Sequence, residues 1–119
     1  MKHGKIWGTT QEIFEWCGVE MHLINVKGGH TCSLHKHHYR HNGFMVISGQ
    51  LVIETHKNDY ELIDKTILGP GERTVCRSGE FHRFIATEDT VAVEWYWVEL
   101  DHSDIERMDH GRKIDESDQ

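Results

Sequence analysis

The stretch SLHKHHYRHNGFMVISGQLVIET, residues 33–55, carries both the strongest fold signal and the strongest chemical signal of this chain. It contains two short apolar runs separated by Gly49-Gln50, a pair typical of a two-residue β-hairpin turn. Ahead of the first run, His35 and His37 stand two positions apart, so on an extended segment their side chains project from the same face. The stretch therefore predicts a hairpin preceded by two imidazoles on one side of the chain.

Outside this stretch, further short strand-like segments follow one another, separated by turn residues such as Gly69-Pro70-Gly71. We predict about nine strands, at the spacing that is typical of an all-β sandwich or barrel. They are Val19 to Val26, Thr31 to His37, Phe44 to Ser48, Leu51 to Thr55, Tyr60 to Ile63, Ile67-Leu68, Arg73 to Cys76, Phe81 to Ala86 and Val91 to Val98. No amphipathic helix of three turns is apparent before residue 100.

The length of the chain, 119 residues, suits a single domain with a short tail. We expect a barrel over residues 1–100 and a polar tail over residues 101–119 that clasps it. Ser103 and Glu106 have the spacing of a capping box, which predicts a short helix in the tail.

Composition argues against several classes of function. The net charge is −7 and the acidic residues are spread along the chain, so binding to a phosphate backbone is not expected. No apolar run approaches the ~20 residues that span a bilayer, and no secretory signal follows the first residues. Cys17, Cys32 and Cys76 form no CxxC pair, so we expect free thiols in a cytoplasmic protein. Walker, dinucleotide-binding and nucleophile-elbow motifs are absent.

A third imidazole, His82, lies in the strand-like segment Phe81 to Ala86. Together with His35 and His37 it predicts a site for a divalent metal ion that keeps positions open for substrate or water. Zinc is the first expectation, and iron, nickel or manganese are alternatives, because imidazole binds several of these ions. The other possibility is a polar pocket in which these histidines bind a ligand or water without metal.

The last strand offers candidate catalytic groups. Glu94 and Tyr96 share one face, and Trp95 and Trp97 share the other. If Glu94 and Tyr96 face inward, they are candidates for a general base and a hydroxyl donor near the metal. The alternative is a polar outer face. The tryptophan stripe is expected in the core or in a dimer-forming sheet.

The histidine spacing resembles the first motif of the cupins, a family of double-stranded β-helix (jelly-roll) barrels. Gly29 is followed by five residues, His35-Lys36-His37, four residues, Asn42, six residues and Gly49. Every spacing of the motif fits, and only its acidic residue is replaced, by Asn42.

The second cupin motif is matched in part, at Gly71, Gly79 and His82, whereas Arg77 and Ala86 replace its proline and asparagine. The resemblance implies an all-β cupin barrel in a single domain. It also implies a homodimer, the common state of cupins.

Within the cupins, the chain resembles the C-terminal domain of type II mannose-6-phosphate isomerases. The similar segments are Lys5-Ile6-Trp7-Gly8 and residues 33–44, 77–83 and 103–112. The resemblance implies that His37 and His82 are metal ligands, and that His35 and Asn42 replace a glutamine and a glutamate ligand. It also makes Arg40 a catalytic residue.

Two other histidines, His38 and His41, lie near the motif. His38 is out of phase with the histidine pair and is expected to be exposed. His41 is the substitute ligand if Asn42 does not face the metal.

Three hypotheses about function follow. The first is a metal-dependent isomerase that acts on a small molecule such as a sugar phosphate through an ene-diol. The second is a three-histidine non-haem iron dioxygenase, which the loss of the motif glutamate favours. The third is a sugar-binding cupin without catalytic activity.

Overall fold

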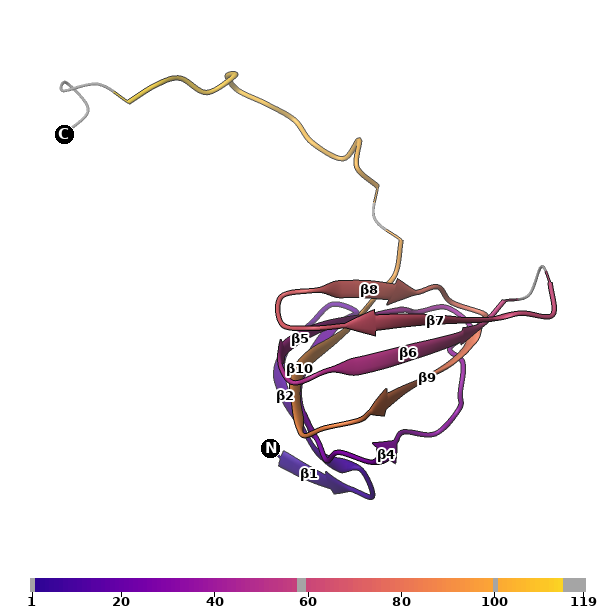
Figure 1. The fold of residues 1–119 in the computed structure, drawn as a ribbon. Helices are drawn as coiled ribbons and strands as arrows, with labels where there is room; N and C mark the ends of the chain where they lie inside the picture. Colours follow the sequence, from indigo (N-terminus) through magenta and orange to yellow (C-terminus); the bar gives the residue numbers. More distant parts are fainter. Residues whose placement is uncertain (1, 58–59, 100, 115–119) are drawn as a thin grey trace.

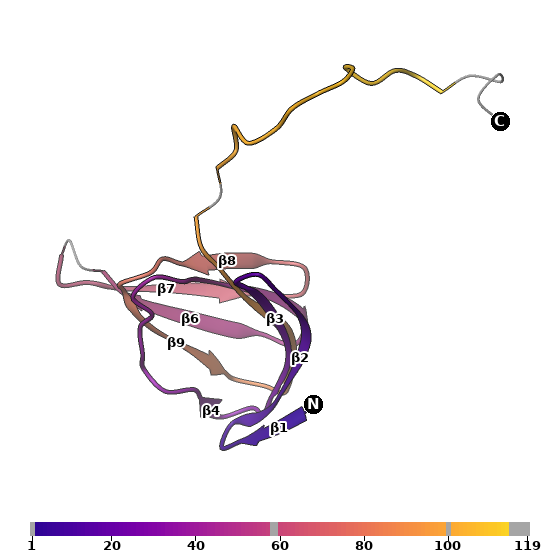
Figure 2. The same cartoon turned by 180° about the vertical axis from the view of Figure 1, so that it is seen from behind.

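The computed structural model describes residues 2–57, 60–99 and 101–114, and these form an all-β barrel without a helix. One sheet has the order β1-β2-β3-β10-β5-β8 and the other β4-β9-β6-β7, and all pairings are antiparallel. Figures 1 and 2 show the arrangement from opposite sides. The strands are β1 Lys2–Lys5, β2 Gly8–Trp16, β3 Val19–Val26, β4 His30–Thr31, β5 His41–Ser48, β6 Leu51–His56, β7 Ile63–Leu68, β8 Arg73–Cys76, β9 Phe81–Ala86 and β10 Thr90–Trp97.

The core lies between the two sheets. Strand side chains alternate, so each strand sends every second residue inward. Phe44 and Val46 of β5 and Ile53 of β6 are at most 1% exposed. They pack with Phe84 of β9, whose ring meets that of Phe44 at 6.0 Å. A turn does occur at Gly49, where φ is +90°, a conformation that favours glycine, and it joins β5 to β6. The expected hairpin is wrong, however, because the turn carries the chain from one sheet to the other, so β5 and β6 do not pair with each other.

The sequence did not indicate two of the strands. The first, β2, pairs with β3 from Gly8 opposite Val26 to Trp16 opposite Val19. A bulge between Glu12 and Phe14 shifts its register, so the alternation that identifies a strand is broken midway. The second, β1, is exposed along its whole length and has no apolar face.

Other strand boundaries were wrong in part. The fragments expected at 60–63 and 67–68 correspond to one strand, β7, which begins only at Ile63, so residues 60–62 lie before it in the loop. It is an edge strand, exposed except at Leu68, so its sequence lacks the alternation of apolar and polar residues that marks a half-buried strand. The strand expected over residues 31–37 is only the short β4 followed by a loop.

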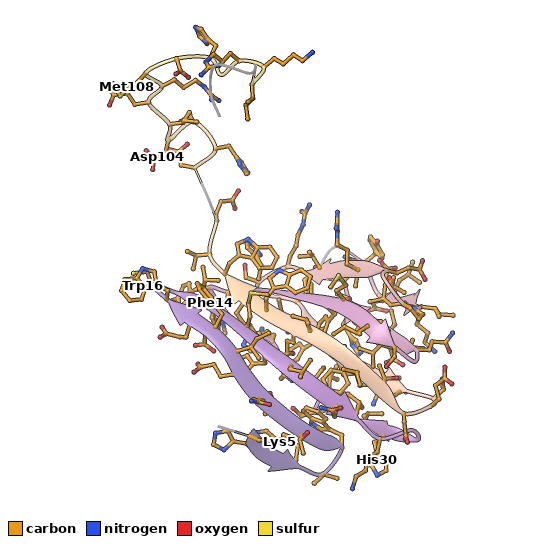
Figure 3. All side chains as sticks on the ribbon, turned by 90° about the vertical axis from the view of Figure 1, so that its left-hand side faces the viewer. Lys5, Phe14, Trp16, His30, Asp104 and Met108 are labelled. Atoms are coloured by element: carbon orange, nitrogen blue, oxygen red, sulfur yellow. The ribbon has the colours of Figure 1, made fainter. Side chains whose placement is uncertain are left out.

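The described part of the tail, residues 101–114, extends away from the barrel instead of clasping it (Figures 1 and 2). It contains turns and no helix, so the helix expected at Ser103 does not form there. The reason is local: the hydroxyl and the main-chain N–H of Ser103 both donate to Oδ1 of Asp101, at 2.6 and 3.0 Å. The hydroxyl of Ser103 is thus bonded to a residue before it in the chain and does not cap the residues that follow. Figure 3 shows Asp104 and Met108 far from the strands.

The outer face of the larger sheet carries the tryptophan stripe. The rings of Trp95 and Trp97 stack at 6.4 Å between centroids. Trp95 lies directly over Gly43 of β5, where an added Cβ would meet the indole at 2.2 Å. Phe14 and Trp16 project near one end of β2 and are 49% and 70% exposed (Figure 3). No helix in the described residues is long and apolar enough to cross a membrane.

Candidate metal centre

Main-chain hydrogen bonds hold two of the three histidines beside each other. The N–H of His35 donates to the carbonyl of His82 at 3.1 Å, and the N–H of His82 donates to the carbonyl of His35 at 2.8 Å. The N–H of Gly79 donates to the carbonyl of His37 at 2.7 Å, so the loop after β4 follows β9. As a result, one nitrogen from each of His35, His37 and His82 lies within 4.8 Å of the others. The structure therefore brings the expected triad together.

Two of these imidazoles have their tautomer fixed by the main chain. Nδ1 of His35 lies 2.8 Å from the carbonyl of Ser33, and Nδ1 of His82 lies 3.0 Å from the carbonyl of Glu80. A carbonyl only accepts, so both Nδ1 atoms carry a hydrogen and both Nε2 atoms keep a lone pair. Histidines that bind a metal usually have such a second partner, which sets the ring orientation.

Asn42 completes the base of the triad. It is fully buried, and its amide nitrogen donates to the carbonyl of Trp95 at 3.1 Å and to the Glu94 carboxyl. Its Oδ1 consequently faces Nε2 of His82 at 3.1 Å. Burial lowers the pKa of His82, so the ring has one hydrogen, which Nδ1 uses. Two acceptors therefore face each other, an arrangement that a shared cation would satisfy, so these residues fit a metal ion.

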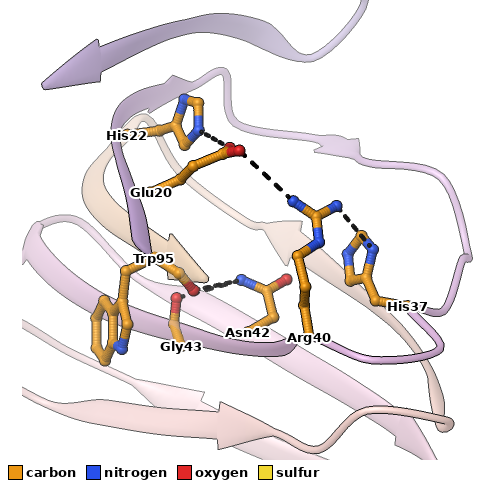
Figure 4. Close-up of polar contacts among 7 residues, drawn as sticks. All are labelled: Glu20, His22, His37, Arg40, Asn42, Gly43 and Trp95. Carbon is orange, nitrogen blue, oxygen red and sulfur yellow. Dashed lines mark hydrogen bonds and ion pairs between the residues drawn. The ribbon is translucent and has the colours of Figure 1, made fainter. Parts of the chain in front are cut away.

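His37 differs from the other two histidines. Its Nε2 is buried and has no hydrogen-bond partner within the described residues. Its Nδ1 lies 3.3 Å from a guanidinium nitrogen of Arg40 (Figure 4). Burial, followed by the charges of Arg40, His35 and His82, lowers the pKa of His37 to about 4. The ring is thus neutral at physiological pH, as a metal ligand must be.

Arg40 lies at the mouth of the site. Its guanidinium is 3.9 Å from Oε1 of Glu20 and stacks over the ring of Tyr96 at 4.5 Å from the centroid. These contacts keep the cation beside the triad, with 41% of the side chain exposed to solvent.

The inner face of the larger sheet supplies a second group of polar side chains. Across β10, Tyr96 stands between Glu20 and Asn42, and Glu94 stands between His22 and Phe44. Of the two alternatives for Glu94 and Tyr96, the inward one is therefore observed. Glu94 is 9% exposed.

Burial is the largest cause of the pKa shifts of Glu94 and Tyr96. It raises the pKa of Glu94, although hydrogen bonds from Tyr96 and Asn42 and the charge of His22 oppose the shift. Burial and the neighbouring Glu94 raise the pKa of Tyr96, so this hydroxyl remains protonated. The arrangement is a carboxyl group that a phenol holds in place inside a cavity.

A cavity of about 690 Å³ opens onto these groups. Its polar lining includes His35, Arg40, Glu94 and Tyr96. Its apolar lining includes Trp7, whose ring packs edge-on against Phe84 at 4.9 Å, and Ile6 in the turn between β1 and β2. The cavity is large enough for a small metabolite.

The remaining candidates lie elsewhere. His38 is exposed, as expected. Asn42 faces inward, so its neighbour His41 faces the other side of β5, where Nδ1 accepts from the N–H of Ser78 at 3.2 Å. His41 is therefore not a substitute ligand.

The cysteines are free thiols, and two of them are buried. Cys32 lines the cavity, and burial raises its pKa to about 12. Because the thiolate is the nucleophilic form, Cys32 is an unreactive side chain at neutral pH.

Comparison with known families assigns the fold. A family model described as "Cupin domain" matches residues 22–99, well over half of the chain. The chain is a cupin. No curated protein matches it significantly.

Solved structures share the fold of this cupin at low sequence identity. The capsular polysaccharide assembling protein CapF from Staphylococcus aureus is 20% identical with a TM-score of 0.74, over 87% of this chain and 30% of CapF. KdgF from Halomonas sp. is 16% identical with a TM-score of 0.71, over 85% and 88%. An oxalate oxidase in complex with glycolate is 20% identical with a TM-score of 0.61, over 68% and 42%. This cupin thus spans about a third of the length of CapF, and these similarities concern the fold.

The polar residues of the cupin cavity that sequence reasoning missed include Glu20 and His22 on β3. Nε2 of His22 lies within hydrogen-bond distance of Oε2 of Glu20, at 3.2 Å (Figure 4), and both residues line the cavity. The alternation of β3 places both on one face, but only the pairing of β3 with β10 shows that this face meets Glu94 and Tyr96.

Proposed function

We propose that this cupin is a metal-dependent enzyme that isomerises a small sugar, with a sugar phosphate as the first candidate substrate, through an ene-diol. The observation that carries the proposal is that Glu94, a buried carboxyl with a raised pKa, lines the same cavity as His35 and Arg40. An aldose–ketose isomerisation needs such a group, because it moves one proton between neighbouring carbons.

In this proposal Glu94 is the general base. Its carboxylate takes the proton from C2 of the aldose, and the C1–C2 double bond forms as the C1 carbonyl becomes a C1–O⁻ group. The hydroxyl proton on O2 passes to O1, and the proton on the carboxyl then returns to C1 as the C2 carbonyl forms, which gives the ketose. The raised pKa supports this role, since a carboxyl that titrates nearer neutral pH both accepts and returns a proton. Tyr96 positions the carboxyl by hydrogen bonding to it.

Arg40 is proposed to orient the substrate through an anionic group. Its guanidinium offers paired donors that match phosphate or carboxylate oxygens. A divalent ion, held by His35, His37 and His82 with Asn42 as a further oxygen ligand, would supply a Lewis acid for the carbonyl oxygen of the substrate. Zinc remains the first expectation for its identity.

Metal content and turnover test this proposal together. We expect near-stoichiometric metal in the purified wild type by elemental mass spectrometry, and its loss in His35→Ala/His82→Ala. We expect conversion of mannose 6-phosphate to fructose 6-phosphate that disappears in His82→Ala and in Glu94→Gln. If the protein takes up no metal on reconstitution, the proposal of a metal-dependent enzyme is refuted. Tight binding of a sugar phosphate without turnover would instead support a sugar-binding cupin without catalytic activity.

A second candidate function is a non-haem iron dioxygenase. The observation that favours it is the amide of Asn42, which makes the donor set of this site entirely neutral. Oxygen uptake that requires Fe(II) and a small thiol or diketone would support this alternative, and its absence with Fe(II)-loaded protein would exclude it for those substrates.

We also propose that the protein forms a homodimer through the outer face of the larger sheet. On this face Phe14 lies opposite Met21, Met21 opposite Trp95, and Gly43 between Trp95 and Val75. Phe14 and Val75 are 49% and 48% exposed, so the row presents apolar surface to solvent. A second copy would cover this surface.

A further inference from the structure

The three histidines of the candidate metal centre are not equivalent, because Arg40 contacts only one of them. Nδ1 of His35 and of His82 each donates to a main-chain carbonyl. Nδ1 of His37 instead lies 3.3 Å from a guanidinium nitrogen of Arg40. A guanidinium has donors and no acceptor, so Nδ1 of His37 must supply the lone pair.

This contact sets the opposite tautomer in His37. In a neutral imidazole only one nitrogen carries a hydrogen, so the hydrogen of His37 is on Nε2. Nε2 is buried without a partner among the described residues, and the centroid of the His37 ring lies 5.1 Å from that of His35 and 5.6 Å from that of His82. His37 therefore presents a hydrogen where a metal ligand needs a lone pair.

A metal ion on Nε2 would reverse this state. The hydrogen would move to Nδ1, where it would point at the guanidinium, and two donors would face each other. The contact between Arg40 and His37 is therefore incompatible with ligation through Nε2. Without His37, Arg40 would keep two contacts that it already makes. A guanidinium nitrogen lies 3.9 Å from Oε1 of Glu20, which lines the cavity (Figure 4), and the guanidinium lies over the ring of Tyr96 at 4.5 Å from the centroid.

We propose that Arg40 competes with the metal ion for His37, so that metal binding releases Arg40 from Nδ1 and turns its donors toward the cavity. The inference rests on the proposed metal site and goes beyond it. It makes Arg40 a residue that weakens metal binding, and it makes metal loading the event that prepares the cavity for an anionic ligand. Metal and anion then bind in a preferred order, the metal first.

NMR of ¹⁵N-labelled protein tests the tautomers of the three histidines in the metal-free protein directly. Long-range ¹H–¹⁵N correlations at pH 7.5 distinguish a hydrogen on Nδ1 from one on Nε2. We expect the hydrogen on Nε2 in His37 and on Nδ1 in His35 and His82. After saturation with Zn²⁺, we expect all three on Nδ1. A hydrogen on Nδ1 of His37 in the metal-free protein would overturn the proposal.

Zn²⁺ affinity, measured by competition with a chelating indicator, tests the competition itself. We expect Arg40→Met to bind Zn²⁺ about tenfold more tightly than the wild type, a change that corresponds to one hydrogen bond to a charged group. Arg40→Gln is the second variant, in case the first is poorly folded. Arg73→Met is the matched control, because it removes the same charge from an exposed position of β8 and should leave the affinity unchanged.

Paired backgrounds separate the contact from simple charge repulsion. His35→Ala and His37→Ala each remove one imidazole, but only His37→Ala removes the partner of Arg40. We expect Arg40→Met to tighten Zn²⁺ binding about tenfold in the His35→Ala background and not in the His37→Ala background. An equal gain in both backgrounds, or no gain in a wild type that binds Zn²⁺, would overturn the inference and leave the metal site intact. Failure of every variant to bind Zn²⁺ would refute the proposed function as well.

Discussion

Replacing Asn42 by aspartate tests the residue at which this cupin departs from the family motif. The substitution hardly changes the shape of the side chain, but it removes the amide hydrogens. In the wild type these hydrogens reach the carbonyl of Trp95 and the carboxyl of Glu94. The new carboxylate cannot donate to either, and it adds a negative charge beside Glu94 in the interior.

The expected magnitude follows from the groups left without a donor. Each buried polar group that loses its partner costs about 1–3 kcal/mol, so two such groups cost about 2–4 kcal/mol after partial relaxation. For a domain of this size, the loss corresponds to a fall in Tm of roughly 10–20 °C. Bound metal should reverse part of the loss, because a carboxylate is a stronger oxygen ligand than an amide. We expect Zn²⁺ binding to tighten at least about tenfold, which is about 1.4 kcal/mol.

Urea unfolding of the metal-free protein and of the Zn²⁺-loaded protein measures both effects. Asn25→Asp is the matched control, since Asn25 is exposed on β3 and its change should stay within about 0.5 kcal/mol. If metal-free Asn42→Asp is as stable as Asn25→Asp, the buried hydrogen bonds of Asn42 do not stabilise the fold. If Zn²⁺ stabilises the wild type and Asn42→Asp equally, Oδ1 of Asn42 does not face the ion.

Three further predictions concern the carboxyl, the core and the outer face. Burial raises the pKa of Glu94, so the stability present below its unfolded pKa of about 4.3 is lost as the pH rises through the folded pKa. The free energy of unfolding of Glu94→Gln in urea should therefore equal that of the wild type at pH 4 and exceed it at pH 7.5. Equal free energies at both pH values would contradict the burial of a charged group. Phe44→Ala should lower the free energy of unfolding by about 3–5 kcal/mol, because Phe44 is 1% exposed, and a loss below about 1 kcal/mol would mean that the sheets are not packed on it. Phe14→Glu should lower the molar mass measured by light scattering from that of a dimer to that of a monomer, whereas Glu12→Gln should leave it unchanged. A wild type with the molar mass of a monomer would refute the proposed dimer.

The sequence predicted the fold and the histidine triad because both depend on local patterns. Short apolar-rich segments between turn residues identify β3, β5, β6 and β9. Gly49 identifies a turn, although the two strands that it joins belong to different sheets and form no hairpin. The i, i+2 pair of His35 and His37 needs only an extended chain to present both rings on one side. These signals are complete within a few residues, so the chain alone carries them.

The remaining features depend on pairings between distant residues. Whether Glu94 faced inward could not be decided from β10, because both faces of that strand carry residues that suit an interior. The contribution of Glu20 and His22 appears only when β3 is placed beside β10. The contact of Arg40 with His37 likewise depends on the path of a loop that no periodic pattern describes.

The reciprocal hydrogen bonds between His35 and His82 have a consequence for how such a site can change over evolution. They involve only main-chain atoms, so the separation of these two positions does not depend on which side chains they carry. Mutation can therefore exchange one donor type for another at either position without rebuilding the frame. A new metal preference would require single substitutions rather than a new loop, and this property would allow one barrel to serve several chemistries.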